Sequence, residues 1–266
     1  MTYNLIHDEK ELKHFFDEVM PPLTSNEVYF FSLSARNKYL SLEEREHFGL
    51  GRTEMFERTI VREKDWNKFL KKIVRYQTVE GGYLTKKNLP IPEKSIVVYF
   101  NINPTNVLKA YNEFLGTMNE YFMELGLNAS KSGDIDNVSK RINKMDVLLM
   151  NCLQRNRGTK HYIDVDFDIP KNQDWILNKF LNNLKENNVT YYVIDTKSGF
   201  HVLLKRDTIK YNFTEVVKNL EQEANTFRLG KMISEQHWEI AVNKNGMIPL
   251  PGTYQGGHPV RIIKGV

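Results

Sequence analysis

Hydrophobic and polar positions alternate along several short stretches of the chain, and a two-residue period of this kind predicts β-strands. The stretches are 27–36 (EVYFFSLSAR), 53–62 (TEMFERTIVR), 94–104 (KSIVVYFNINP) and 161–170 (HYIDVDFDIP). Residues 189–206 (VTYYVIDTKSGFHVLLKR) form two further apolar runs that break at Ser198-Gly199, which is the pattern of a β-hairpin.

In other segments the apolar residues recur every three or four positions, a spacing typical of helices packed on a core. Helices are predicted over 9–20, 65–77, 106–126, 141–154, 173–188 and 213–229. Residues 128–140 carry Gly, Ser, Asn and Asp and are predicted to form a loop.

Near the C-terminus, two more strand-like runs, 237–242 (HWEIAV) and 247–264 (MIPLPGTYQGGHPVRIIK), flank Asn245-Gly246. Asn-Gly is a strong hairpin signal, so these runs are predicted to pair. The order strand, helix, hairpin, helix, hairpin predicts an α+β fold with helices on one side of the sheet. We divide the chain into an N-terminal αβ region, 1–92, and a second region, 93–266, and expect the two to form one compact core.

Composition limits the class of protein but does not indicate its chemistry. The 266 residues are 41% hydrophobic with a net charge of +4, a mild lean toward anionic partners. A single cysteine excludes a disulfide framework and a cysteine-rich zinc site. The N-terminus lacks the apolar core of a signal peptide and no run reaches membrane-spanning length, so we expect a soluble, cytoplasmic protein without membrane partners.

Candidate chemistry begins at Asp164, Asp166 and Asp168, three acids in an otherwise apolar strand. Side chains two apart on a strand point to the same face, where like charges repel unless a cation lies between them. Carboxylates of this kind bind hard divalent ions. An EF-hand is disfavoured because Ile169 stands where its loop needs Gly, which leaves a solvated edge or, as the favoured reading, a two-metal phosphoryl-transfer site.

The predicted hairpin supplies groups that could hold a triphosphate. Ser198 and the Gly199 backbone can donate to phosphate oxygens at a tight turn, and Lys197 adds positive charge. His201 follows on the next strand. The alternative for a lone strand histidine is a hydrogen-bonded structural residue, but its position beside Ser-Gly favours a phosphate contact.

Together, "DVDFD", "SGFH" and a late acid resemble the three motifs of archaeo-eukaryotic primases. Asp164 and Asp166 match the first motif, and Ser198 and His201 match the second. "VVYFNINP" (97–104) is similar to an N-terminal strand of primase-polymerases, so the resemblance covers about 97–264. It implies an RRM-like antiparallel sheet joined to an N-terminal αβ unit, with 93–266 as the catalytic region.

The third motif is matched by Glu239, although relatives usually have Asp there. Asp168, Asp195 and Glu235 are its competitors as a metal ligand. The alternative role of Asp168 is helix entry, that of Asp195 is a hydrogen bond to the turn, and Glu235 is expected in a loop. Where relatives often place an Arg before a Pro-Gly segment, this chain has Leu250, and Arg261 or Lys264 would supply the charge.

The resemblance implies a DNA primase-polymerase that adds NTPs or dNTPs on a single-stranded DNA template with two Mg²⁺ or Mn²⁺ ions, and starts primers de novo. Asp164, Asp166 and Glu239 would hold the metals, and Lys197, Ser198, Gly199, His201 and Arg261 the nucleotide. A helicase or CRISPR proteins are the further partners it implies. The alternatives are a non-catalytic single-strand-binding replication protein and a two-metal nuclease. The basic segments 63–75 and 139–160 are either solvated faces or contacts to a phosphate backbone.

Overall fold

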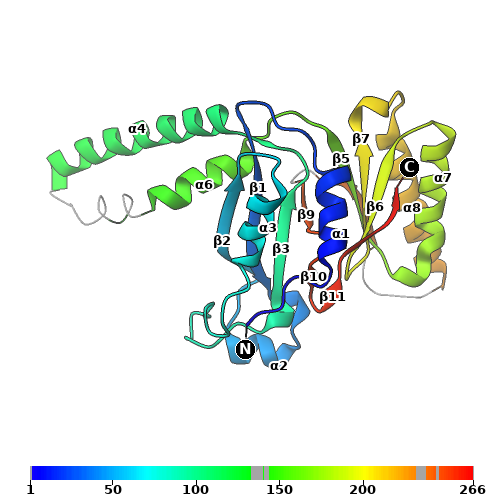
Figure 1. Cartoon of the computed structure of the whole chain (residues 1–266), viewed down its shortest axis with the longest axis horizontal. Coiled ribbons are helices and arrows are strands. Elements are labelled where there is room, and N and C mark those ends of the chain that lie inside the picture. Colours follow the sequence, from blue (N-terminus) through cyan, green and yellow to red (C-terminus); the bar gives the residue numbers. More distant parts are fainter. Residues whose placement is uncertain (1, 133–139, 141–143, 232–237, 244–245, 266) are drawn as a thin grey trace.

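Two antiparallel sheets lie side by side in the computed structural model, which describes residues 2–132, 140, 144–231, 238–243 and 246–265 (Figure 1). The α+β class predicted from the order of the elements is confirmed. Within the described residues, no helix is both long enough and apolar enough to cross a membrane.

The first sheet has the strand order β11-β10-β3-β1-β2, with β4 paired to β1 and β9 paired to β3. The π-helical turn after α1 supplies Phe15 and Phe16, and α3 supplies Phe69, to a core against β1 and β3, where Phe31 and Phe100 are fully buried. The elements of this half are α1 (Glu9–His14) with a π-helical turn (Phe15–Val19), β1 (Glu27–Arg36), a 3-10 turn (Asn37–Tyr39), α2 (Leu42–Phe48), β2 (Thr53–Val61), α3 (Trp66–Val74), a 3-10 turn (Glu93–Ser95), β3 (Ile96–Asn101), β4 (Thr105–Asn106), β9 (Met247–Pro249), β10 (Tyr254–Gln255) and β11 (His258–Pro259).

The second sheet has the order β12-β6-β7-β5-β8. Its apolar face packs against α7 and α8, which lie on the same side of the sheet, as the sequence predicted (Figure 1). The predicted hairpin is confirmed as β6 and β7. The elements are β5 (Tyr162–Asp168), a 3-10 turn (Lys171–Gln173), α7 (Asp174–Glu186), β6 (Tyr191–Asp195), β7 (Phe200–Lys205), a 3-10 turn (Arg206–Thr208), α8 (Phe213–Lys231), β8 (Glu239–Val242) and β12 (Arg261–Gly265).

A helical arm, formed by α4 (Val107–Ser132) and α6 (Met145–Arg155), extends away from the first sheet (Figure 1). Helix α4 runs past residue 128, where the sequence predicted a loop to begin. The polar residues at this point therefore continue the helix instead of ending it. Residues 133–139 of the predicted loop, and 141–143 of the helix predicted after it, lie outside the described residues.

The second predicted hairpin is wrong. β8 pairs with β5 of the second sheet, whereas β9 pairs with β3 of the first, so the two runs separate after the Asn-Gly signal. Each of these two strands pairs with a strand that is distant in sequence, and the local pattern does not reveal such a partner. This tertiary pairing overrides the preference of Asn-Gly for a hairpin turn. The division at residues 92 and 93 likewise does not coincide with the sheets, since β3 and β9–β11 belong with β1 and β2.

Candidate active-site cleft

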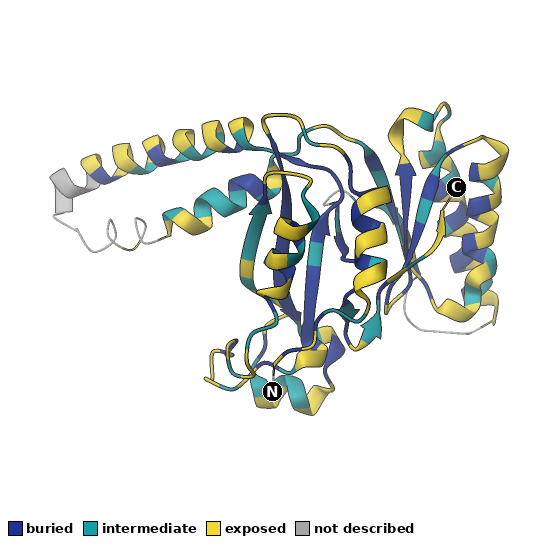
Figure 2. Ribbon diagram, in the orientation of Figure 1, coloured by how far each residue is buried: buried dark blue, intermediate teal, exposed yellow. Residues whose placement is uncertain are grey.

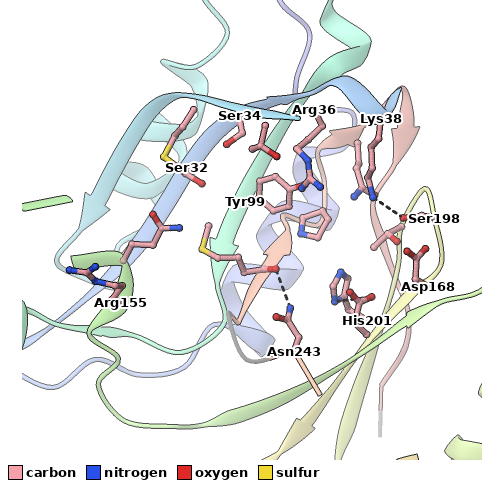
Figure 3. A pocket seen from close by; sticks show the side chains of 18 of the residues that line it. Ser32, Ser34, Arg36, Lys38, Tyr99, Arg155, Asp168, Ser198, His201 and Asn243 are labelled. Atoms are coloured by element: carbon pink, nitrogen blue, oxygen red, sulfur yellow. Dashed lines mark hydrogen bonds and ion pairs between the residues drawn. The ribbon is translucent and has the colours of Figure 1, made fainter. Parts of the chain in front are cut away.

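A cleft of about 660 Å³ opens between the two sheets. Figure 3 shows its basic and its acidic walls facing each other. The side contributed by the first sheet and the arm consists of Ser32, Ser34, Arg36, Lys38, Thr53, Met55, Tyr99, Gln154, Arg155, Arg157, Met247, Pro249 and Gln255. The other side consists of Asp166, Asp168, Thr196, Ser198, His201 and Asn243.

β5 places its three acids on one face, as the two-residue period predicted. Val165 and Phe167 are buried on the opposite face, in the core with α7 and α8. The start of the strand is fixed by Asn103, whose side chain donates to the carbonyl of Tyr162 (2.9 Å) and accepts from the backbone amides of His161 and Tyr162. An amide side chain from the segment between β3 and β4 therefore sets the position of the acidic strand in the second sheet.

His201 lies between Asp164 and Asp166. It is the cross-strand neighbour of Asp166, and its Nδ1 is 3.0 and 3.1 Å from the two carboxylate oxygens of Asp164 and 3.8 Å from Oδ1 of Asp166. Burial alone would lower the pKa of His201, but the Asp164 carboxylate, with help from Asp166, raises it to about 9. The ring is therefore cationic at neutral pH and compensates the charge of the acids.

The two acids of the first motif have different surroundings. Asp164 is 1% exposed and accepts hydrogen bonds from His201 and from Nδ2 of Asn243 (2.7 Å). The side chain of Asp166 is 46% exposed and lines the cleft. The pKa of Asp166 is raised, first by burial and then by the charges of Asp164 and Asp168, while His201 opposes the shift. Asp166 thus presents a carboxylate to the cleft at a place where negative charge accumulates.

The turn between β6 and β7 carries the second motif. Its backbone is closed by a hydrogen bond from the Thr196 amide to the Gly199 carbonyl (3.0 Å). Gly199 is required because a Cβ there would lie 1.8 Å from the carbonyl oxygen of Phe167 on β5. The close approach brings Ser198 to the rim of the cleft beside Asp168 (Figure 3).

Lys38, which follows β1, lies across the cleft from the acids. Its Nζ is 3.4 Å from the hydroxyl of Ser198. Burial lowers the pKa of Lys38 and Arg36 lowers it further, whereas Asp168 and Asp166 raise it. Arg36 donates to the hydroxyl of Tyr99 (2.9 Å), and the buried Nε of Arg36 has no hydrogen-bond partner among the described residues.

Sequence reasoning missed this basic wall. The signal was present: Ser32, Ser34 and Arg36 alternate with buried apolar residues in β1 in the same way that the aspartates do in β5. Arg157 at the end of the arm adds a further guanidinium, and burial lowers its pKa to about 10. Arg157 lies in the basic segment 139–160, which the sequence predicted as either a solvated face or a contact to a phosphate backbone, without linking it to the acids.

Several of the predicted site residues do not line the cleft; besides Gly199, whose backbone forms the turn, they are Lys197, Glu239, Arg261 and Lys264. Lys197 folds over the ring of Tyr39 and donates to the carbonyl of Gly256 (2.5 Å). Arg261 is exposed on β12, opposite Asp195, and Lys264 lies further along the same strand. Glu239 is exposed at the start of β8. None of these lines the cleft, so the structure gathers Asp166, Ser198 and His201 there, with Asp164 directly behind them.

The register of β8 bears on the third acid. Glu239 is the partner of Asp168, and Ala241 is the partner of Asp166. Paired residues share a face, so Glu239 lies on the acidic face but one pair further along than Asp166. Asp195 does not line the cleft, and its carboxylate pairs with Lys171 (2.5 Å) and His258 (3.1 Å). Glu235 lies outside the described residues. The assignment of Glu239 stays a prediction.

Within the described residues, no three His, Cys, Asp or Glu side chains are grouped closely enough to hold a metal ion. Mg²⁺ is commonly bound through one or two carboxylates together with water and substrate phosphates, without a complete protein cage. The oxygen donors of Asp166 and Asp168 at the cleft, with Asp164 behind, fit that mode of binding.

Comparison of the chain with protein-family models, with curated proteins and with solved structures finds no match in any of the three.

Proposed function

We propose that the protein is a template-directed nucleotidyltransferase, a DNA primase-polymerase of the archaeo-eukaryotic type that its motifs resemble. One observation carries the proposal: Asp166 and Asp168 line the same cleft as Lys38 and Arg36, and His201 connects Asp166 to the buried Asp164 directly behind it. A triphosphate coordinated to divalent metal ions needs acids for the metals and cations for the phosphates, at a separation that one nucleotide can span.

In this proposal Asp166 and Asp164 hold Mg²⁺ or Mn²⁺, with Glu239 or Asp168 contributing a further carboxylate. The ions would stabilise charge that develops on the attacking and leaving oxygens. The cations of this chain then act on the nucleotide: Lys38 and Ser198 contact phosphate oxygens, and Arg36 fixes the nucleotide against Tyr99. His201 orients Asp164 and balances the charge of the acidic strand.

The finer fold assignment is part of the same proposal. The second sheet, with α7 and α8 on one face and the acids on the other, is consistent with an RRM-like catalytic unit. The first sheet with α1 and α3 corresponds to the N-terminal αβ unit. The substrates would be a single-stranded DNA template and NTPs or dNTPs, with a helicase or CRISPR proteins as further partners.

The test is primer synthesis on unprimed single-stranded DNA and extension on a primed template, with labelled NTPs or dNTPs and either Mg²⁺ or Mn²⁺. We expect activity in the wild type and a loss of at least about a hundredfold in Asp166→Asn, since a metal ligand acts mainly in the transition state. Asp174→Asn, an exposed acid on α7 outside the cleft, is the matched control and should retain activity.

The alternatives give different results in the same assay. A nuclease would degrade the labelled template in a metal-dependent way. A non-catalytic binder would retain the strand without extending it, and Asp166→Asn would then bind no less tightly. Extension by Asp166→Asn at the wild-type rate would overturn the proposed role of the acids.

A further inference from the structure

Helix α3 differs from the other helices in the charges that it carries. Its residues Trp66–Val74 include three lysines and no acid, whereas every other α-helix within the described residues contains at least one Asp or Glu. The helix lies beside β2, the edge strand of the first sheet, and its outer side is exposed (Figure 1 and Figure 2). It therefore presents positive charge that no acid of its own compensates.

The positive side chains of α3 lie along one side of the helix. Lys68, Lys71, Lys72 and Arg75, the residue that ends the helix, are spaced at i, i+3, i+4 and i+7. Positions with this spacing are neighbours on the surface of a helix. We call these four residues the α3 row.

The α3 row lines a groove of about 550 Å³ together with the end of β2, and we call it the β2–α3 groove. Ile60 and Val61 of β2 contribute apolar surface, and Arg62 and Glu63 follow directly after the strand. The groove thus holds five cations, the row and Arg62, against one acid. That acid, Glu63, is paired with Lys68, and the other four cations have no acidic partner among the described residues. The groove therefore carries an excess of positive charge.

This charge has an energetic cost for the free protein. Each member of the α3 row is three or four residues from another member, and like charges at these spacings destabilise a helix. The ion pair with Glu63 compensates only Lys68. Lys64 is not part of the groove, because its Nζ donates to the carbonyls of Asp17 and Met20 (3.1 and 2.8 Å). An anion in the groove would relieve the remaining repulsion, so the groove favours a ligand with several negative charges.

The length of the row fits a chain of phosphates better than a single anion. At a rise of about 1.5 Å per residue, the row spans about 10 Å from Lys68 to Arg75. One strand of a nucleic acid carries a phosphate about every 3.4 Å along a duplex axis, so this length corresponds to about three phosphate steps. The described residues that line the groove include no aromatic side chain on which bases could stack. The groove is therefore suited to a phosphate backbone and not to the bases.

We propose that the β2–α3 groove binds the phosphate backbone of a single nucleic-acid strand, whatever its base sequence. The groove and the cleft have no lining residue in common, so this is a second site. A single row of cations matches one strand, whereas a duplex presents a second backbone across a groove about 6 Å wide or more. The choice of a single strand also rests on the template of the proposed function. Binding itself needs neither nucleotide nor metal, so the two proposals can fail separately.

The first experiment measures the binding of a labelled oligothymidylate by fluorescence anisotropy, in EDTA and between about 50 and 200 mM salt. Lys71→Gln/Lys72→Gln should raise the dissociation constant at least about tenfold. It should also reduce the salt dependence, the slope of log K against log salt, by about 1.4, since each phosphate contact to a single strand contributes about 0.7. Oligoadenylate should show the same loss, because the groove does not contact the bases.

The matched control is Lys185→Gln/Lys218→Gln. It removes the same charge from exposed positions on α7 and α8, the helices that cover the face of the second sheet opposite the acids. Its dissociation constant and its salt slope should equal those of the wild type, which separates a local site from an effect of net charge.

The second experiment locates the strand on the wild-type chain by lysine acetylation and mass spectrometry, so it does not depend on the folding of any variant. With oligothymidylate at about ten times its dissociation constant, acetylation of Lys71 and Lys72 should slow by up to about tenfold, since about one molecule in ten remains unbound. Lys185 and Lys218 should react at the same rate with and without the strand.

A wild type that does not bind the strand, unprotected Lys71 and Lys72, or a loss of binding no greater than that of the control overturns the proposal. An equal loss of affinity for a duplex of the same length contradicts the choice of a single strand. Poly-glutamate that binds as tightly as the oligonucleotide, and is lost equally in the variant, would assign the groove to an acidic protein instead. Absence of primer synthesis with this binding intact would overturn the proposed function alone. Circular dichroism of each variant shows whether the fold is retained.

Discussion

The two aspartates of the first motif are close in sequence but differ strongly in burial. Asp164 is enclosed with His201 and Asn243, whereas Asp166 faces the cleft. Removing one partner of a buried ion pair leaves the other uncompensated. Asp164→Asn should therefore lower the free energy of unfolding by about 3 kcal/mol or more.

Asp166→Asn should change the free energy of unfolding by less than about 1 kcal/mol, because water already screens its half-exposed carboxylate. Urea unfolding of the two variants, followed by circular dichroism with EDTA present, gives the comparison. Equal losses in both variants would show that the burial difference has no energetic consequence.

The charge on His201 makes stability depend on pH. Its pKa is about 9 in the folded protein, above the ordinary value of 6.5, because Asp164 outweighs the effect of burial. A pKa raised on folding stabilises the native state fully below about pH 6.5, and this contribution is lost as the pH rises through about 9. It corresponds to about 3 kcal/mol at most.

We therefore expect the wild type to exceed His201→Gln in stability by the largest margin near pH 6, with the margin shrinking toward pH 10. Unfolding free energies measured without divalent ions across this range provide the test. A margin that is independent of pH would mean that the ring is neutral in the folded protein.

The residues of the acidic strand and of the hairpin turn could be predicted from the sequence, because the patterns that indicate them are local. A two-residue period predicts which face a side chain occupies, and Ser-Gly marks a turn. Lys38, Arg36 and Arg157 were not predicted as site residues, since their meeting with the acids depends on how two sheets are placed against each other. The burial of Asp164 against His201, instead of its exposure in the cleft, was likewise not predictable, because it depends on the register between β5 and β7.

Among the elements, the β6–β7 hairpin depends most visibly on one residue. The backbone at Gly199 lies against β5 so closely that any side chain would collide with the Phe167 carbonyl. Gly199→Ala should force the turn away from β5, lower stability by about 2–4 kcal/mol and displace Ser198 from the rim. Thermal unfolding and the extension assay together measure both effects.

Gly230→Ala on α8 is the matched control for that substitution. No atom lies within 4 Å of a Cβ added there, and alanine favours the helix, so stability should not fall. If Gly199→Ala were as stable as this control, the close approach of β7 to β5 would not be essential.

The elements themselves were largely predictable, and their pairing was only partly so. The β6–β7 pair is joined by four residues, and its pattern predicted it correctly. β8 and β9 are also close in sequence, yet they belong to different sheets because each pairs with a strand far away along the chain. Hydrophobic periodicity identifies a strand but contains no information about distant partners.

For the whole molecule, the crossing of the chain between sheets predicts how it unfolds. After β8 the chain enters the first sheet as β9–β11 and returns to the second as β12. Neither sheet can be lost without freeing strands that connect directly to the other. We therefore expect one cooperative unfolding transition.

Two single-tryptophan variants report on the two halves. Trp66 contacts Phe16 and Phe69 in the core of the first sheet, and Trp238 is buried in the core of the second. The first variant, Trp175→Phe/Trp238→Phe, keeps Trp66, and the second, Trp66→Phe/Trp175→Phe, keeps Trp238. In each variant, the unfolding transition followed by tryptophan fluorescence should coincide with the transition followed by circular dichroism. A fluorescence midpoint that precedes the dichroism midpoint in either variant would reveal independent domains.

The position of β3 has a consequence for the protein during its synthesis. β3 pairs with β1 on one side and with β9 and β10 on the other, although β1 is made early and β9 and β10 about 150 residues after β3. Until residues 247–255 have left the ribosome, a nascent chain has one side of β3 unpaired. An apolar strand with a free edge readily pairs with neighbouring chains. The nascent polypeptide is therefore most in need of chaperone protection over the interval between these two segments.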